Sequence, residues 1–431
     1  MCGVFIANLR HPLNLTRLFC LVWPALLVFL MAIWRRSEPR LLGASLASFL
    51  WTIPALLALQ PVADRMSAWS FEPGNGALLG VPAELLLGWA LLWGALPVLV
   101  FPKAPLLFPV LSATALDLMA MPLCAPVLNL GPNWLVGELV AVIFVLLPAL
   151  ILGRSIAAKQ RLRLRVLLGA IGYAGLQYFV VPALVLEQTG ANWDHALGWS
   201  REVQGFFLQA AFFLGVPGLS AVQEFFQRGA GTPLPFDPPR RLVTSGPYAY
   251  VANPMQVSTM LLFLLAGVWT GSLWVAAAGG VGLATAIGIA AWHEQTQLSE
   301  RFGDAWARYR AEVRTWLPRW RPRFVFPARL YIAEHCALCA SVAHWFSNHS
   351  PIQLIILPAE SHPNRTLRRM RYEAPGFSAD GIAAFAHAIE HLHLGWAFIG
   401  WTLRLPLVVD LSQFLVDLSG GGPRTLPDHP N

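Results

Sequence analysis

Apolar segments alternate with short polar breaks over the first 292 residues of the chain. A helix needs about 17–25 apolar residues to cross a bilayer core of about 30 Å. Nine segments have this length, at residues 18–34, 41–59, 78–101, 104–127, 133–153, 166–187, 205–225, 255–271 and 273–292. Asp117 and several prolines interrupt the segment 104–127, so a kinked or re-entrant segment is an alternative there. The pattern predicts about nine transmembrane helices.

The pattern changes after Pro322. Short apolar runs begin at Leu330 and Ile352 and predict strands, whereas amphipathic runs begin at Ala340 and Gly381 and predict helices. About 100 residues are enough for one small α/β domain. Three regions are therefore expected: N-terminal transmembrane helices at 1–200, a membrane core at 201–322, and a soluble domain at 327–431.

Composition agrees with a membrane protein, because 56% of the residues are hydrophobic and only 12% are charged. Soluble domains carry about twice that share of charge. In a membrane protein, a net charge of +7 indicates basic residues that orient the loops and contact lipid headgroups. The chain has no basic tail with interleaved aromatic residues, so the expected partner is the lipid bilayer and not nucleic acid.

Basic residues crowd the loops at 35–40 and 154–165, whereas the loop at 186–195 carries Glu187 and Asp194 and no basic residue. The excess of Lys and Arg in cytoplasmic loops then places the C-terminal domain in the cytoplasm. The expected location is multi-pass in a bacterial inner membrane. Nine spans would put the N-terminus outside, but the basic segment before the first span argues against this, so its side stays open.

Two polar segments bracket the last two predicted spans. In the first, Gly246-Pro247-Tyr248 predicts a turn, and Asn253 before Pro254 is biased out of the helical region. A helix starting at Pro254 would offer backbone N–H groups beside the Asn253 side chain, which suits a polar ligand. The alternative is an ordinary start of a transmembrane helix.

The second segment begins at Trp292 and places Glu294 at the end of a span, beside His293 and Gln295. A carboxylate there can pair with arginine, or bind an amine or a ribose hydroxyl. The alternative is an interfacial helix whose charges meet water and headgroups. Because a hairpin returns the chain to the side it left, the two segments can meet at one membrane face.

Together, the two segments resemble the isoprenylcysteine carboxyl methyltransferase and phospholipid methyltransferase superfamily, over about residues 205–322. The family pattern is roughly GPYxYxRHPxY before the hairpin and EExxLxxxFGxxYxxY after it. The matching residues are Gly246, Pro247, Tyr248, Tyr250, Pro254, Glu294, Leu298, Phe302, Gly303, Tyr309 and Pro318. The resemblance implies methyl transfer from S-adenosyl-L-methionine, at the cytoplasmic face, to a lipidic or prenylated acceptor.

By position, the resemblance assigns the cofactor site to Gly246, Tyr248, Asn253, Pro254, Gln256, Glu294 and Gln295. This chain departs from the family pattern at five positions: Ala252 replaces Arg, Asn253 replaces His, Gln256 replaces an aromatic residue, Gln295 replaces the second Glu, and Trp306 replaces the first Tyr. The loss of Arg and Glu removes a charge pair. It puts in doubt the carboxyl substrate of the prenylcysteine enzymes.

Methyl transfer needs the nucleophile, methyl group and sulfur held in line and shielded from water. A base is required only if the nucleophile carries a proton, and Glu294 and His293 are the nearest candidates. The ring of Tyr248 or Tyr250 can face the sulfonium in a cation–π contact.

Cys336 and Cys339 form a C-x-x-C between a predicted strand and a predicted helix. A helix N-terminus stabilises a thiolate, so Cys336 would be the reactive thiol and Cys339 the resolving one. A reducing cytoplasm favours redox or metal chemistry over a structural disulfide. Zinc and a pair of inert thiols remain alternatives, but the nearby histidines complete no four-ligand set, so no metal site is predicted.

Residues 327–424 resemble the DCC family of thiol-disulfide oxidoreductases. The resemblance lies in CALC, the following helix with Trp345, GIAAFAHAIEHL, and GWAFIGWTLRLP. It implies a thioredoxin-like fold and a redox partner protein. Ala333 and Glu334 replace the family's Asp-Gly before the first cysteine, which leaves a module that binds a partner or a lipid as an alternative. The run from Gly395 is interpreted as buried or interfacial.

The expected fold class is thus a multi-span α-helical membrane protein with a C-terminal α/β, thioredoxin-like domain. The expected function is a membrane methyltransferase fused to that domain. Two alternatives remain open. One is a membrane-tethered thiol-disulfide oxidoreductase. The other is a non-catalytic scaffold or transporter that uses the charges of Glu84, Asp117, Glu138 and Asp194.

Overall fold

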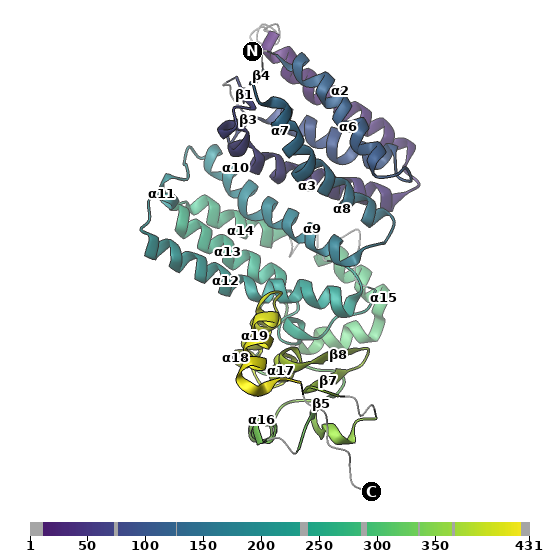
Figure 1. The fold of residues 1–431 in the computed structure, drawn as a ribbon, viewed down its shortest axis with the longest axis vertical. Helices are drawn as coiled ribbons and strands as arrows, with labels where there is room; N and C mark the ends of the chain where they lie inside the picture. The colour runs from purple at the N-terminus through teal and green to yellow at the C-terminus, as the bar shows by residue number, and fades with distance from the viewer. Residues whose placement is uncertain are drawn as a thin grey trace. The chain divides into compact units, whose positions relative to one another are not determined.

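A computed structural model describes residues 12–72, 76–125, 127–232, 240–285, 291–334, 337–363 and 367–423. These residues are mostly helical and form two compact units (Figure 1). The first unit contains the chain up to Trp193, and the second contains the described chain from Asp194 onward. The second unit therefore holds both motif segments and the C-terminal sheet.

Seven helices in the described part of the chain are long and apolar enough to cross a membrane. They are Leu15–Trp34, Pro39–Arg65, Ala83–Val100, Leu107–Cys124, Trp134–Ala157, Leu162–Gln188 and Arg201–Gly229. The first seven predicted segments are thereby confirmed as helices, and 104–127 is a single helical span. The hairpin helices are shorter, so nine full spans are not confirmed. The count rises to eight if the bent pair Leu394–Leu403 and Val408–Gly421 is one span.

In the first unit, α3 (Pro39–Arg65) is the central helix and packs against α8 (Leu147–Ala157) and α9 (Leu162–Gly175). Around them lie α2 (Pro12–Trp34), α4 (Ala83–Trp89), α5 (Leu96–Val100), α6 (Leu107–Ala120), α7 (Trp134–Ala141) and α10 (Val181–Gln188). Two small antiparallel pairs join β1 (Trp69–Phe71) to β4 (Leu128–Leu130) and β2 (Ala77–Leu78) to β3 (Val81–Pro82).

Three spans of this unit contain a π-helical segment in the middle: Ala90–Ala95, Val142–Leu146 and Leu176–Val180. In each, a proline follows two residues after the segment ends, at Pro97, Pro148 and Pro182. Proline has no N–H, and its ring collides with the carbonyl four residues earlier. A π turn just before it relieves this collision without ending the helix, so the prolines do not break the spans.

The second unit begins with the short helix α11 (Asp194–Leu197) and the long helix α12 (Arg201–Glu224). α13 (Pro254–Thr270) packs against α12 and forms a hairpin with α14 (Leu273–Thr285) (Figure 1). Gly271 ends α13 in the left-handed region, at φ +67°, which glycine adopts without strain. α15 (Ala291–Glu312) follows, with a kink at Gly303.

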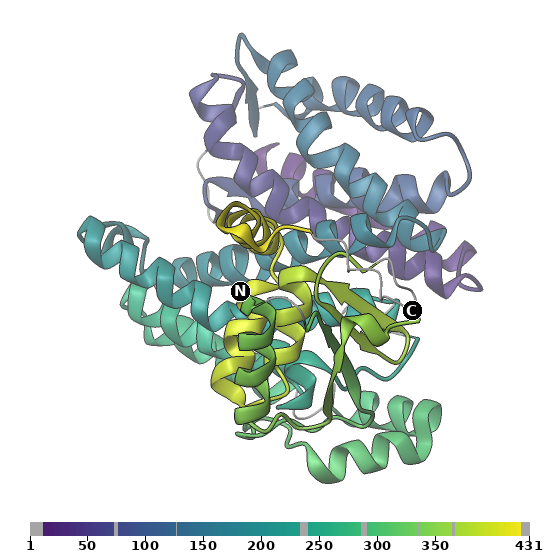
Figure 2. The same cartoon turned by 60° about the horizontal axis from the view of Figure 1, so that its bottom comes forward.

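A four-stranded mixed sheet follows, whose strands come forward in Figure 2. Their order is β6-β5-β7-β8. β5 (Ala328–Ile332) is parallel to β6 (Leu354–Pro358), and β7 (Arg371–Ala374) is antiparallel to both β5 and β8 (Phe377–Asp380). α16 (Ala337–Asn348) connects β5 to β6, and α17 (Gly381–Ile389) follows β8. Both strands and both helices predicted after Pro322 are present.

The run from Gly395 forms α18 (Leu394–Leu403) and leads into α19 (Val408–Val416). These two segments meet at a bend of 91°. Ala397, Gly400 and Trp401 of α18 are buried, whereas α19 buries none of its residues. The buried part of the run agrees with its interpretation from the sequence.

Candidate active site

The two polar segments that bracket the hairpin are joined by backbone hydrogen bonds. The first segment forms a 3-10 turn, Gly246–Ala249, and then a short irregular link into α13. The N–H of Ala252 donates to the carbonyl of Arg314 at 2.9 Å. In return, the N–H of Arg319 donates to the carbonyl of Tyr250 at 3.0 Å, and that of Arg323 to Ala249 at 2.9 Å. The predicted meeting of the two segments is therefore present.

A buried side chain adds to this link. The Tyr309 hydroxyl donates to the carbonyl of Tyr248 at 2.9 Å, and only 1% of Tyr309 is exposed. Burial raises the pKa of Tyr309 above its ordinary value, which keeps the hydroxyl protonated as a donor. One tyrosine of the second motif thus holds the backbone of the first.

Gly246 lies directly against Glu224, at the end of α12. It has φ +59°, and a Cβ there would come within 2.7 Å of Glu224 Cγ. Both the left-handed backbone and the close approach require glycine at this position. Next to it, the Tyr248 ring stacks on Phe225 at 5.2 Å and is 6% exposed.

The start of α13 has the form predicted from Asn253-Pro254. Asn253 is the N-cap residue with φ −122°, and Pro254 is the first helical residue. The Asn253 side chain makes no capping hydrogen bond. Asn253 and Gln256 are both half-buried beside the turn at Gly246–Ala249. A polar amide that does not cap its own helix, next to backbone N–H groups, suits a polar ligand.

His293, Glu294 and Gln295 belong to the first turns of α15. Their side chains lie outside the part of the structure that is described. Their assignment to the cofactor site, and that of Glu294 and His293 to base chemistry, stay predictions.

Two departures from the family pattern lie together in space. Ala252, where the family has Arg, is 8% exposed and packs in one cluster with Tyr309, Val313 and Trp306. Trp306 stands where the family has Tyr, and its ring lies 5.8 Å from that of Tyr309. The small residue and the large aromatic one therefore pack in the same buried cluster.

The side chain of Tyr250 contacts the C-terminal part of the second unit. It is fully buried, its hydroxyl donates to the carbonyl of Glu390 at 2.7 Å, and its ring meets Trp401 edge-on at 5.5 Å. These contacts bind the motif turn to the C-terminal part of the unit, and the cation–π role of Tyr248 or Tyr250 stays a prediction.

A buried charge cluster beside the motif turn was missed from the sequence. It joins Glu224 to Arg404 at 2.6 Å, Arg404 to Glu390 at 2.7 Å, and Arg228 to Glu224 at 3.1 Å. The sequence gives only a weak sign of this cluster. Glu224 and Arg404 are charged residues within apolar runs, and burial of a charge costs free energy unless it is paired.

Glu224, His387 and Glu390 bring their ligand atoms within 4.8 Å of one another, as a metal site would. However, the Arg404 guanidinium already lies between the two carboxylates. Burial raises the pKa of Glu390 to about 8 and lowers that of His387 well below its ordinary value. The arrangement is that of an ion-pair network.

Of the C-x-x-C, Cys336 lies outside the described residues. The helix expected after it, α16, begins at Ala337. Cys339 is half-buried and packs against the core between the sheet and its helices. The predicted redox roles of both cysteines therefore stay predictions.

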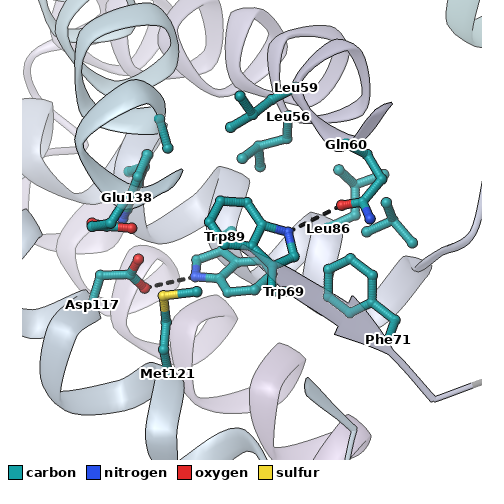
Figure 3. A pocket seen from close by; sticks show the side chains of 13 residues that line it. Leu56, Leu59, Gln60, Trp69, Phe71, Leu86, Trp89, Asp117, Met121 and Glu138 are labelled. Atoms are coloured by element: carbon teal, nitrogen blue, oxygen red, sulfur yellow. Dashed lines mark hydrogen bonds between the residues drawn. The ribbon is translucent and has the colours of Figure 1, made fainter. Parts of the chain in front are cut away.

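The first unit contains a second candidate site, a small cavity between its helices (Figure 3). Asp117 and Glu138 line one side of it, each 4% exposed. The Trp89 indole donates to Asp117 at 2.7 Å. The cavity volume is about 30 Å³, which admits about one water molecule and excludes a lipid or S-adenosyl-L-methionine. Glu84 begins α4, and Asp194 is exposed in α11.

Comparison with known proteins gives one match. A model of the phospholipid methyltransferase family matches residues 206–305, which contain most of α12, the motif turn, the hairpin and the first part of α15. No curated protein and no solved structure matches the chain. Residues 206–305 of this multi-pass helical protein are thus similar to phospholipid methyltransferases, which indicates a membrane methyltransferase with a lipid-like substrate.

Proposed function

We propose that the protein is an integral-membrane methyltransferase that uses S-adenosyl-L-methionine, and that the cofactor binds between the motif turn and α15. The observation that carries this proposal is the closed link between the two motif segments inside and beside the matched region. A bound cofactor would supply an activated methyl group on a sulfonium.

The residues present fit such a ligand. The Asn253 amide and the N–H groups at the start of α13 are suited to its polar groups, and Glu294 to its amine or ribose hydroxyls. The turn at Gly246 keeps the backbone close to α12. Because the sulfonium is already activated, the task of these residues is to orient the cofactor and exclude water. The acceptor is proposed to be lipidic or prenylated and to enter from the bilayer.

The C-terminal sheet is proposed to be a thioredoxin-like domain of the DCC type. The strand order β6-β5-β7-β8, in which β7 runs opposite to the other three strands, supports this. So does the start of α16 at Ala337, within the C-x-x-C. The cytoplasmic side of this domain, its redox partner and its thiol chemistry belong to the same proposal.

Binding of radiolabelled S-adenosyl-L-methionine by the purified full-length protein tests the function. Glu294→Ala and Asn253→Ala are expected to weaken binding strongly. The control is Glu300→Ala, which removes an exposed carboxylate from the same helix α15. Absence of binding to the wild-type protein would refute the proposal. Insulin reduction that persists in Glu294→Ala without cofactor binding would favour the tethered oxidoreductase instead.

A further inference from the structure

Arg404 lies at the C-terminal end of α18 and is 2% exposed. Its guanidinium reaches α12 twice, at Glu224 Oε1 (2.6 Å) and at the Ser220 hydroxyl (2.8 Å). Its Nε contacts Glu390 Oε1 at 2.7 Å. A residue near the end of the chain is thus bound to the helix where the methyltransferase match begins.

Glu224 also contacts the motif turn, so it connects Arg404 to that turn. Its second oxygen, Oε2, accepts a hydrogen bond from the Ser245 hydroxyl at 2.6 Å. Ser245 is the residue before Gly246 and is the N-cap of the turn. Because the Cα of Gly246 also packs against Glu224, the side chain of Glu224 forms one wall of the turn.

A second contact also joins the motif turn to the C-terminal part of the chain. Tyr250, at the end of the motif turn, is held by the Glu390 carbonyl and by Trp401. Both partners belong to the C-terminal part of the chain. Val216, Ala249 and Leu405 complete a buried apolar cluster around Tyr250 and Trp401. The motif turn therefore rests on α18 as well as on α12.

The buried polar groups in this contact depend on one another. Two arginines, Arg228 and Arg404, face the carboxyl groups of Glu224 and Glu390. The planar guanidinium presents donors in fixed directions, so Arg404 donates to the Glu224 carboxylate and the Ser220 hydroxyl at once, while its Nε lies 2.7 Å from Glu390 Oε1. A lysine would supply the charge but not this geometry. Removal of one partner leaves a buried charge without compensation.

We propose that Arg404 is a positioning residue for the methyltransferase site, through which the C-terminal domain holds the Ser245–Tyr250 turn in its cofactor-binding conformation. This rests on the proposed function, in which the turn binds S-adenosyl-L-methionine. Coupling of this kind is reciprocal. The cofactor at the turn must therefore also slow the opening of α18.

The test compares Arg404→Met, Arg404→Lys and the wild-type protein. Hydrogen exchange of the turn amides is measured without cofactor, and titration with S-adenosyl-L-methionine gives Kd and the number of sites per chain separately. Arg404→Met is expected to speed exchange at the turn and to raise Kd by about 10-fold or more, with a smaller effect on the number of sites. Arg404→Lys is expected to restore only part of the exchange protection and of the affinity. A merely structural loss would lower the number of sites and leave Kd unchanged.

Arg369→Met is the matched control, because it removes another arginine–carboxylate pair, with Asp417, in the same part of the chain. It is expected to leave turn exchange and Kd unchanged. If Arg404→Met does not fold, Ser245→Ala removes only the last contact and is expected to act in the same direction, more weakly. Wild-type exchange and Kd in folded Arg404→Met or in Ser245→Ala would overturn the proposal. Failure of the wild type to bind cofactor refutes the proposed function, whereas the exchange measurement still tests the contact.

Discussion

Replacement of Tyr309 by Phe tests the link between the two motif segments. The change removes the hydroxyl that donates to the Tyr248 carbonyl at 2.9 Å and keeps the ring that packs beside Trp306. Loss of one partner of a buried hydrogen bond costs about 1–3 kcal/mol. If this cost falls on the closed form of the motif turn, affinity for S-adenosyl-L-methionine falls by about 5- to 150-fold.

The assay is isothermal titration of the purified protein with S-adenosyl-L-methionine, together with hydrogen exchange at the turn. Tyr331→Phe is the control, because Tyr331 is a buried tyrosine in β5 of the C-terminal sheet. It is expected to bind the cofactor as the wild type does. Wild-type affinity in folded Tyr309→Phe, with unchanged exchange at the turn, would refute the idea that this link closes the site.

Three further predictions follow from single contacts. Gly246→Ala is expected to abolish measurable cofactor binding, because the left-handed φ of +59° and the contact with Glu224 both exclude a Cβ; wild-type binding in the titration would contradict this. Ala252→Arg is expected to lower the thermal midpoint of unfolding, because overpacking a filled cluster costs about 1–3 kcal/mol. Adding Trp306→Tyr to that variant is expected to recover part of the lost midpoint. Equal midpoints for the single and double variants would contradict the idea that residues 252 and 306 compensate for each other's size. Burial lowers the pKa of His391 from 6.5 to about 3. Below pH 6.5 the unfolded chain therefore binds a proton at His391 that the folded chain does not. The free energy of unfolding falls by about 2 kcal/mol between pH 6.5 and pH 5 as a result. His391→Gln is expected to reduce that slope in unfolding measured against pH, and an unchanged slope would exclude His391 as its source.

The helical spans could be predicted because bilayer thickness sets the length of an apolar run. α13 follows the predicted segment 255–271 to within one residue at each end, and its 17 residues lie at the lower limit of the expected length. The described part of α14 has 13 residues, so its full predicted length stays a prediction. Strands β7 and β8 were missed, since Arg371 and Glu373 interrupt any simple apolar pattern.

The motif turn was found from residue types alone, because Gly246 permits a left-handed backbone, whereas Pro254 has a fixed φ and restricts Asn253 before it. The partners of Glu224 were not found. Arg404 is 180 residues away in the sequence, and no local spacing connects the two. A charged residue in an apolar run indicates that a partner exists, but only the folded chain shows which one.

Direct titration of the purified full-length protein with S-adenosyl-L-methionine is the measurement that tests the central claim. Saturable binding of one cofactor per chain is expected, strongly weakened in Asn253→Ala and Glu294→Ala and kept in Glu300→Ala. Absence of saturable binding by the folded wild-type protein, or equal binding by all three variants, would contradict it.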